Sequence, residues 1–542
     1  MARTVSVQRE SLAPPQGGDY RRSIGFFALL MTGLGSIIGS GWLFGAAKGA
    51  SVAGPAAVIA WVIGAFAIML VALSYTELGS MFPRSGGMVR YAQYSHGSLA
   101  GFIGAWSNWI AIASVIPIEA QASIQYMSSW PFGWAHGLYQ GVELQPQGLL
   151  LACVLVVVYF LINYWGVSLF AHTNGVITVL KVVIPATVVL GLIGAHFVPG
   201  NFTEHGGFAP YGVPAILTAV ATSGVVFAFN GFQSPVNLAG EARNPGRAVP
   251  LAVIGSILVA GIIYIGLQIA FIGAVPKSDL GHGWAGISFS SPFAELALAV
   301  GLNWLAILLY ADAFVSPSGT GMTYTATTAR MIQGMQENGY MPRILGHVDP
   351  RSGVPRPAMW VNLVVAFIFM FMFRGWGTLA GVISVATVIS YATGPVAVTV
   401  LRRTAPDAPR PLRIGGLRLL APAAFIVASL ILYWSRWPLT GEVILIMAVG
   451  IPVYLYFQAR AHFAGFRPQL KGGAWLVAYL FWMGLLSELG SHRFGGSGLI
   501  PYGWDMVVVA VSSLAFYVWG LRSGWVNEWL REAMGQSRAT VP

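Results

Sequence analysis

The chain is dominated by apolar segments about twenty residues long, separated by short polar connections. A helix needs about 20 mainly apolar residues to cross the hydrocarbon core of a bilayer. We identify fourteen candidate spans, at residues 24–47, 52–81, 99–128, 148–170, 173–198, 213–240, 249–274, 292–330, 355–373, 376–402, 416–435, 437–460, 473–490 and 503–523. Charged residues make up only 9% of the chain, whereas soluble domains carry about 25%. The sequence therefore predicts an all-α polytopic membrane protein.

The basic residues are distributed unevenly between the connections. With a cytoplasmic amino terminus, 23 of the 29 Lys and Arg lie in the tails or in cytoplasmic loops, and five lie outside. Because cytoplasmic loops are enriched in Lys and Arg, we expect both termini in the cytoplasm. The net charge of +11 then reflects topology and attraction to anionic lipid rather than a nucleic-acid partner. The single cysteine, Cys153, excludes an internal disulfide, and we expect no metal and no cofactor.

Two spans are interrupted near their middles by glycine, serine or proline. The first contains GSIIGSG, residues 35–41, and the sixth contains FAFNGFQSP, residues 227–235. Unwound backbone is tolerated in a bilayer only where it lines a cavity or finds partners. Because the interrupted spans are five apart, spans 1–5 and 6–10 are predicted to form two inverted repeats around a midplane site. The alternative is that these glycines only allow close helix packing.

This symmetry divides the chain into five predicted parts. They are a cytoplasmic tail (1–23), a first repeat (24–198), a second repeat (213–402), additional helices 11–14 (416–523) and a second cytoplasmic tail (524–542). The additional helices would pack outside the repeats or contact lipid.

The two breaks suit opposite charges. Opening the helix at Gly39–Ser40–Gly41 creates a half-helix amino terminus, whose free N–H groups and positive dipole end suit a carboxylate. Backbone carbonyls freed around Phe229 and Asn230 suit an ammonium group. A zwitterion such as an amino acid fits both ends.

Several motifs occur in the order found in one transporter superfamily. They are GSGWLF (39–44), YSHG (94–97), LINYW (161–165), GEARNP (240–245), DAFVSPSGTG (312–321) and YWSRW (433–437). Over almost its whole length the chain resembles the amino acid–polyamine–organocation (APC) superfamily, and within it the bacterial aspartate–proton symporters. The resemblance implies a LeuT-like 5+5 inverted-repeat fold with discontinuous helices 1 and 6. It also implies secondary active transport by alternating access across the bacterial plasma membrane.

The resemblance also assigns residues to the substrate. The substrate carboxylate would be held at Ser40 and Gly41, and the ammonium group by carbonyls of Ile37, Phe227 and Asn230. Asn230 departs from the family pattern, in which an apolar residue is more usual, so its amide would contact the substrate side chain or water. The remaining candidates beside the breaks are Gly231 for substrate binding and Trp42, Phe44 and Phe229 as a gate.

Lys181 lies within the fifth span. A lysine at the centre of a membrane helix costs about 2.5–3.5 kcal/mol, which makes it a functional candidate unless it extends to the interface. The resemblance implies that it occupies the place where sodium-coupled relatives hold a cation between spans 1, 5 and 8. We therefore predict that Lys181 couples transport to protons, with Ser316 and Ser318 lining the same place.

Two acidic residues, Glu119 and Asp312, also lie deep in predicted spans. Each is either a proton relay or a structural hydrogen-bonding group. The arginines within the predicted spans lie at the span ends and none is buried deep in a span, so an acidic substrate side chain has no evident basic partner.

The sequence favours a proton-coupled symporter for a small or acidic amino acid such as aspartate or glutamate. An amino acid or amine exchanger is the alternative within the transporters. A nutrient receptor with the same pocket is disfavoured because the sequence contains no long soluble domain. An enzyme is disfavoured because no nucleophile and base have catalytic spacing within the spans.

Overall fold

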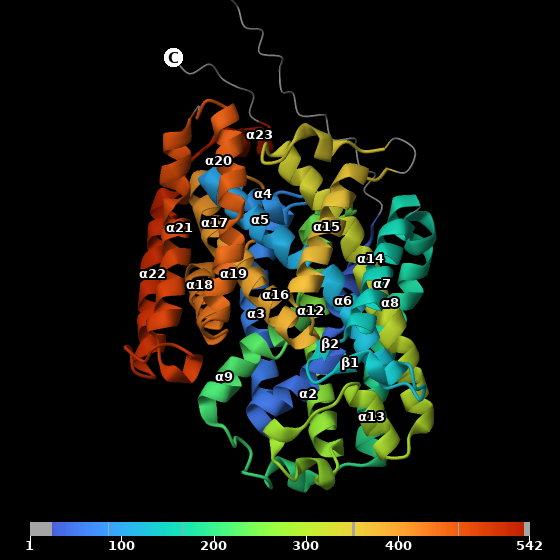
Figure 1. Ribbon diagram of the computed structural model, residues 1–542. Coiled ribbons are helices and arrows are strands. Elements are labelled where there is room, and N and C mark those ends of the chain that lie inside the picture. Colours follow the sequence, from blue (N-terminus) through green and yellow to red (C-terminus); the bar gives the residue numbers. More distant parts are fainter. Residues whose placement is uncertain (1–23, 85, 166, 350–352, 464, 536–542) are drawn as a thin grey trace, which may run out of the picture.

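The computed structural model describes residues 24–535 apart from 85, 166, 350–352 and 464. Its helices run between an upper and a lower face in Figure 1. The predicted tails lie partly outside the described residues, since 1–23 and 536–542 are not described. The described part of the second tail contains a short helix, α23 (Glu528–Ala533), which packs against α4 (Met88–His96) at the upper face (Figure 1).

The helices within the first predicted repeat are α1 (Phe26–Ile37), α2 (Gly41–Ala53), α3 (Ala57–Met81), α4, α5 (Ser98–Ala113), α6 (Val115–Met127), α7 (Pro146–Trp165) and α8 (Val167–Ala195). Those within the second are α9 (Gly212–Thr222), α10 (Val225–Ala228), α11 (Ser234–Asn237), α12 (Pro245–Ala274), α13 (Pro292–Ala299), α14 (Asn303–Glu337), α15 (Arg356–Met372), α16 (Trp376–Tyr391) and α17 (Thr393–Thr404). The additional helices are α18 (Leu417–Trp434), α19 (Leu439–Ala448), α20 (Gly450–Arg460), α21 (Phe466–Leu489) and α22 (Trp504–Ser523). Short 3-10 turns lie at Gly54–Ala56, Ala135–Gly137, Pro199–Phe202, Ala239–Glu241, Lys277–Leu280, Trp284–Gly286, Arg343–Gly346 and His492–Phe494. The strands β1 (Tyr139–Gln140) and β2 (Glu143–Leu144) form an antiparallel hairpin.

The fold is that of an all-α polytopic membrane protein, as predicted. Every predicted span falls on one helix or on consecutive helices, and ten helical runs of the described chain are long and apolar enough to cross a membrane. The span predicted at 292–330 differs, because Gly301 adopts φ +79° and separates α13 from α14. The division into repeats at the stated boundaries stays a prediction.

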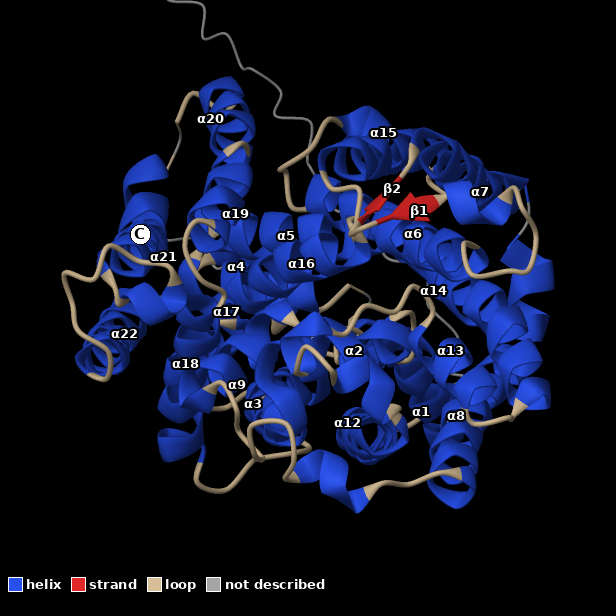
Figure 2. Ribbon diagram, turned by 60° about the horizontal axis from the view of Figure 1, so that its bottom comes forward, coloured by secondary structure: helices blue, strands red, loops and turns tan. Residues whose placement is uncertain are grey.

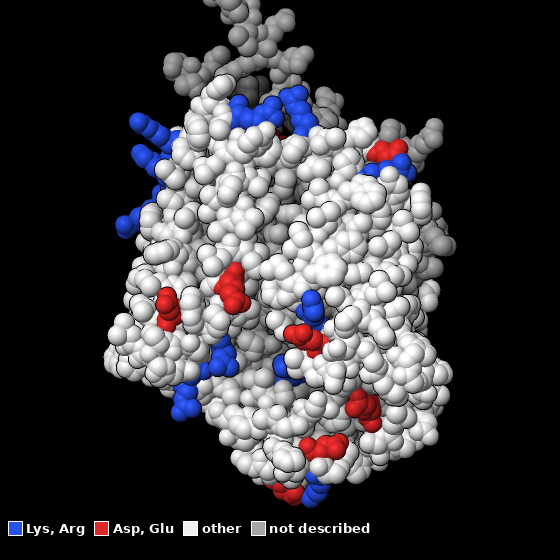
Figure 3. Space-filling view, in the orientation of Figure 1, with Lys and Arg blue, Asp and Glu red and all other residues white. Residues whose placement is uncertain are grey.

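The outer surface is apolar where a bilayer would surround it. Leu190, Ile262 and Phe481 are each more than 70% exposed, which is unfavourable in water for side chains of this kind. Figure 3 shows a broad uncharged zone across the upper half of this face, with Lys and Arg along the upper edge, while charged residues of both signs are scattered over the lower half. The apolar band and the basic edge are those expected of a membrane protein.

The elements that carry the two breaks lie at the centre of the molecule. The long helix α12 packs against α1, α3 and α8, and α14 packs against α6, α7 and α8. The helices α18, α21 and α22 stand together at one side of this bundle (Figures 1 and 2). Additional helices thus support the bundle from outside, while α1, α10, α12 and α14 surround the site.

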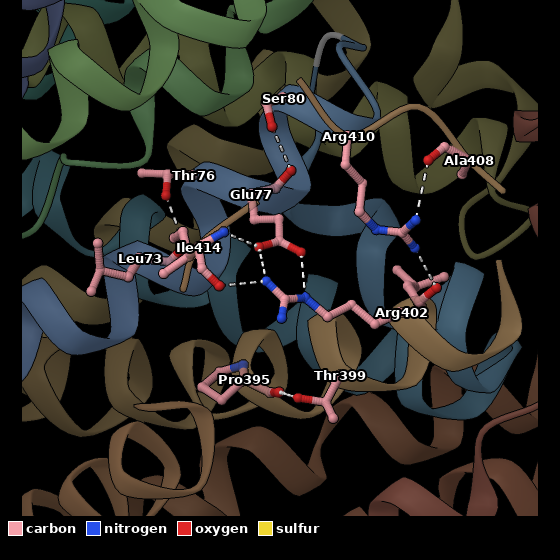
Figure 4. A network of polar contacts seen from close by, with 11 residues as sticks. Leu73, Thr76, Glu77, Ser80, Pro395, Thr399, Arg402, Ala408, Arg410 and Ile414 are labelled. Atoms are coloured by element: carbon pink, nitrogen blue, oxygen red, sulfur yellow. Dashed lines mark hydrogen bonds and ion pairs between the residues drawn. The ribbon is translucent and has the colours of Figure 1, made fainter. Parts of the chain in front are cut away.

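A buried ion pair joins α3 to α17 near the upper face. The Glu77 side chain is fully buried and accepts hydrogen bonds from Arg402 Nε at 2.7 Å and Arg402 Nη2 at 2.5 Å. Glu77 also accepts the Ile414 N–H at 3.0 Å, and Arg402 donates to the Ile414 carbonyl at 2.8 Å (Figure 4). The pair therefore fixes the connection after α17 as well as the two helices.

Candidate functional site

Both predicted breaks occur in the helices. α1 ends at Ile37, Ile38 has an extended backbone, and α2 begins at Gly41. In the sixth span, Gly224 adopts φ +83° before the single turn α10, and residues 229–233 separate α10 from α11. Residues 36–41 and 228–233, which include the helix ends beside the unwound residues, are hereafter called the two breaks.

The two breaks pack against each other backbone to backbone. Gly231 has φ +128°, and a Cβ added there would lie 2.7 Å from the Ser36 carbonyl oxygen. A Cβ pointing from Gly41 would lie 2.9 Å from Ala228 Cα. Only glycine allows so close an approach at these positions, because a side chain would push the segments apart. This contact explains the glycines structurally without excluding a binding role.

Two tyrosine hydroxyls serve carbonyl groups at both breaks. Tyr264 of α12 lies 3.1 Å from the Ile37 oxygen and 3.1 Å from the Ala228 oxygen. Tyr324 of α14 lies 3.2 Å from the Ser36 oxygen and 3.4 Å from the oxygen of Asn230. Because each hydroxyl has one hydrogen, these two hydrogens are shared among four carbonyl oxygens, of which the Ile37 oxygen also accepts the Gly39 N–H at 3.1 Å. These carbonyl oxygens therefore outnumber the hydrogens donated to them.

The amino end of α2 already receives a carboxylate from the protein. The Ser40 N–H donates to Glu119 Oε2 at 2.9 Å, and the Glu119 side chain is buried. The Ser40 hydroxyl accepts the indole N–H of Trp376, the first residue of α16, at 2.9 Å. The predicted position for a substrate carboxylate thus binds a carboxylate in this structure, and that carboxylate belongs to α6.

A small cavity lies between the breaks. Its volume is about 10 Å³, and it is lined by Ser36, Ile37, Gly39, Gly41, Val115, Glu119, Phe227, Asn230, Thr320 and Tyr324. A space of this size holds at most one water molecule. An amino acid can enter only if the Glu119 side chain moves or the helices around the breaks separate.

Lys181, on α8, lies beside the first break and reaches α1 and α14. Its side chain is buried, and Nζ donates to the Gly35 carbonyl at 2.9 Å and to Thr320 Oγ1 at 2.5 Å. Thr320 Oγ1 is also 3.5 Å from the Ile38 carbonyl. Thus the buried ammonium group contacts α1 directly at Gly35 and is linked to Ile38 through Thr320, and it does not extend to the interface.

The two predicted serines of α14 do not contact this ammonium group. Ser318 is hydrogen-bonded to the hydroxyl of Tyr159 on α7 at 2.9 Å, and the Ser316 hydroxyl has no hydrogen-bond partner among the described residues. Thr320, four residues beyond Ser316, makes the contact instead. Asp312 is 3% exposed, and its Oδ2 also has no partner in the described part of the chain.

The Asn230 amide belongs to a polar network. Its oxygen accepts from Gln233 Nε2 at 2.9 Å and from the Tyr391 hydroxyl at 3.2 Å, and its Nδ2 lies 3.4 Å from Thr387 Oγ1. The Gly231 N–H donates to Gln233 Oε1 at 3.0 Å. This network orients the Asn230 side chain at the cavity.

The predicted gate residues occupy three different surroundings. Phe44 packs against Trp376 with ring centroids 4.9 Å apart, and Phe227 packs against the same indole at 5.8 Å. Trp42 packs on Phe293 of α13 at 5.8 Å. Phe229 instead contacts the rings of Trp61 and Tyr264, which lie on α3 and α12. Trp376 therefore packs against Phe44 and against Phe227, which lines the cavity, while Phe229 packs into the bundle.

Sequence reasoning missed four residues of this site, namely Tyr264, Tyr324, Thr320 and Trp376. Each looks like ordinary packing or a helix terminus in the sequence, and only the position of the helices brings their polar atoms to the breaks. The described residues contain no group of three His, Cys, Asp or Glu that could hold a metal ion.

Comparison with known proteins agrees with this architecture. The family model described as amino acid permease matches residues 24–486. The chain is 59% identical over 515 residues to the glutamate/serine transporter AimA of Bacillus subtilis, covering 94% of this chain and 96% of that protein. It is 37% identical over 518 residues to the aspartate-proton symporter of the same organism, covering 94% and 97%. The chain therefore belongs to the amino acid permease family of the APC superfamily.

Proposed function

We propose that the protein is a proton-coupled amino acid symporter of the bacterial plasma membrane, with both termini in the cytoplasm. The observation that carries the proposal is the pair of breaks, which offers a backbone N–H donor at Ser40 and carbonyl oxygens at Ile37 and Ala228 that share the single hydrogen of the Tyr264 hydroxyl. A carboxylate fits the first group and an ammonium group fits the second. An α-amino acid carries both at the required short separation.

Substrate binding proceeds by exchange of carboxylates. In this structure, in which the cavity is too small for an amino acid, Glu119 accepts the Ser40 N–H. An incoming substrate carboxylate takes over this donor, and the displaced Glu119 side chain accepts a proton because an unpaired buried carboxylate is unfavourable. The substrate ammonium group donates to the carbonyls of the two breaks.

Lys181 is proposed to couple this exchange to the first span. While charged, it donates to Gly35 and Thr320 and so holds α1 against α14. Loss of one proton leaves the amine with fewer donors, which weakens this link and lets α1 move during alternating access. Glu119 and Lys181 would then carry the proton, while Asp312 contributes a further buried carboxylate.

The preferred substrates are proposed to be small or acidic amino acids. The relatives that are 59% and 37% identical are described as a glutamate/serine transporter and an aspartate-proton symporter. Among the residues that the structure describes, no Lys or Arg lines the cavity between the breaks. An acidic side chain would instead be held by amide and hydroxyl donors, of which the network around Asn230, Gln233 and Tyr391 is nearest to the cavity.

Uptake into proteoliposomes tests this function. Purified protein should concentrate radiolabelled L-glutamate, L-aspartate or L-serine when a proton gradient is directed inward, and the Lys181→Ala variant should lose the dependence on that gradient. Lys277→Ala is the matched control, because Lys277 lies in an exposed loop and pairs with Glu204. Uptake that requires amino acid inside the vesicles and ignores the proton gradient would establish the exchanger instead.

A further inference from the structure

A basic hollow lies at the upper ends of α21 and α22, away from the proposed transport site. Its volume is about 370 Å³. Arg467, Lys471 and Gly472 line it from α21, and Arg522 and Trp525 line it from the end of α22 and the residues that follow. In Figure 3, basic side chains gather at the upper left edge, on the side where these helices stand in Figure 1.

The charges of this hollow are not balanced within the protein. No acidic residue lines it, and Arg467, Lys471 and Arg522 form no ion pair among the described residues. Arg467 and Lys471 also lie in the first two turns of α21, where the positive end of the helix dipole disfavours cations. Three exposed cations and a helix amino end therefore concentrate positive potential on one concave surface.

We propose that this hollow binds the phosphate group of an anionic phospholipid. Arginine guanidinium groups match phosphate oxygens with paired hydrogen bonds. The distribution of basic residues assigns this face to the cytoplasmic leaflet, whose anionic lipids are attracted to such clusters. The site is separate from the two breaks and does not depend on the proposed transport function.

The surroundings favour a lipid over free phosphate. Farther along the same two helices, exposed apolar side chains form the outer surface, including Phe481 of α21 at 72% exposed and Val511 of α22 at 64%. Trp519, 44% exposed, and Trp525 lie near the same end, where interfacial aromatic residues are common. A headgroup in the hollow would have its acyl chains beside this apolar surface.

Lipid retention by the purified full-length protein tests the site. The protein is incorporated into phosphatidylcholine nanodiscs containing a tenth of phosphatidylglycerol, transferred to detergent and analysed by native mass spectrometry. The triple variant Arg467→Gln, Lys471→Gln, Arg522→Gln should bind phosphatidylglycerol roughly a hundredfold more weakly, about fivefold for each cation. The matched control is Arg343→Gln, Arg413→Gln, Arg418→Gln, which removes three exposed cations outside the hollow and should retain the lipid like the wild type.

Two further measurements decide the source of the phosphate and do not depend on the variant. In the wild type, phosphatidylglycerol should slow amide hydrogen exchange at residues 466–472 and 522–526, whereas phosphatidylcholine alone should not. Inorganic phosphate at millimolar concentration should give little protection. Equal lipid retention by the triple variant and the control overturns the proposal, and protection by inorganic phosphate without protection by the lipid overturns the lipid assignment.

Discussion

Replacing Glu119 by glutamine tests whether a carboxylate of the protein competes with the substrate. Glu119 Oε2 accepts the Ser40 N–H at 2.9 Å inside a cavity of about 10 Å³. In the Glu119→Gln variant, the amide oxygen can still accept this bond, but the charge is lost. Since a bound substrate must replace the bond, a weaker internal bond should make substrate binding tighter.

The size of the effect follows from the type of hydrogen bond. A hydrogen bond to a charged group contributes about 1.5–3 kcal/mol, and a neutral one about 0.5–1.5 kcal/mol. The difference, about 1–1.5 kcal/mol, corresponds to roughly five- to twelvefold tighter binding. Lower pH should reduce the difference in substrate affinity between the variant and the wild type, because protonated Glu119 is neutral like the glutamine amide.

Equilibrium binding of radiolabelled L-glutamate to the purified protein at pH 7 measures this difference. The control is Glu295→Gln, which makes the same chemical change on α13, where Glu295 accepts the Ser291 N–H outside the cavity. The control should bind like the wild type. Unchanged or weaker binding by the Glu119→Gln variant would refute the competition between the two carboxylates.

Three further predictions concern stability. Arg402→Ala leaves the buried Glu77 carboxylate without its ion-pair partner and should lower the free energy of unfolding by about 3–5 kcal/mol. The double variant Glu77→Gln, Arg402→Met removes both charges and should lower it less. Thermal unfolding in detergent compares the two variants, and equal losses of stability would contradict this argument. Burial lowers the pKa of His96 from 6.5 to about 4, so the unfolded chain takes up a proton first and stability should fall by about 3 kcal/mol as the pH drops from 6.5 to 4. The loss of stability at low pH should be smaller in the His96→Asn variant than in the wild type. The same pH dependence of the unfolding temperature in both proteins would argue against a neutral buried His96 ring. Gly231→Ala should destabilise the protein and abolish uptake because of its positive φ and the nearby Ser36 carbonyl; normal uptake would show that the breaks can separate without penalty.

The sequence was sufficient to predict the breaks, because glycine and serine inside an apolar span leave backbone groups that need partners. Lys181 could be identified as a buried cation for the same reason, since the bilayer makes charge exceptional. The coupling and binding roles of these residues remain predictions. A local sequence pattern therefore reveals that a membrane span contains a group that is unusual in a bilayer.

The partners of those groups could not be predicted. Glu119 and Ser40 are 79 positions apart, and Lys181 and Thr320 are 139 positions apart. Whether a hydroxyl or an indole meets a break depends on helix rotation and crossing, which residue spacing does not determine. The separation of α13 from α14 could have been predicted more readily from the sequence, because Gly301 is the type of residue that commonly ends a helix.

The tyrosine hydroxyls at the breaks have an evolutionary consequence. Tyr264 and Tyr324 act on main-chain oxygens, which every amino acid substitution at those break positions preserves. In the proposed binding mode, recognition of a primary amine is therefore independent of the side chains that surround the rest of the substrate. Related proteins can therefore change their substrate specificity by substituting a few cavity-lining residues, while the proposed binding of the amino group by main-chain oxygens is retained.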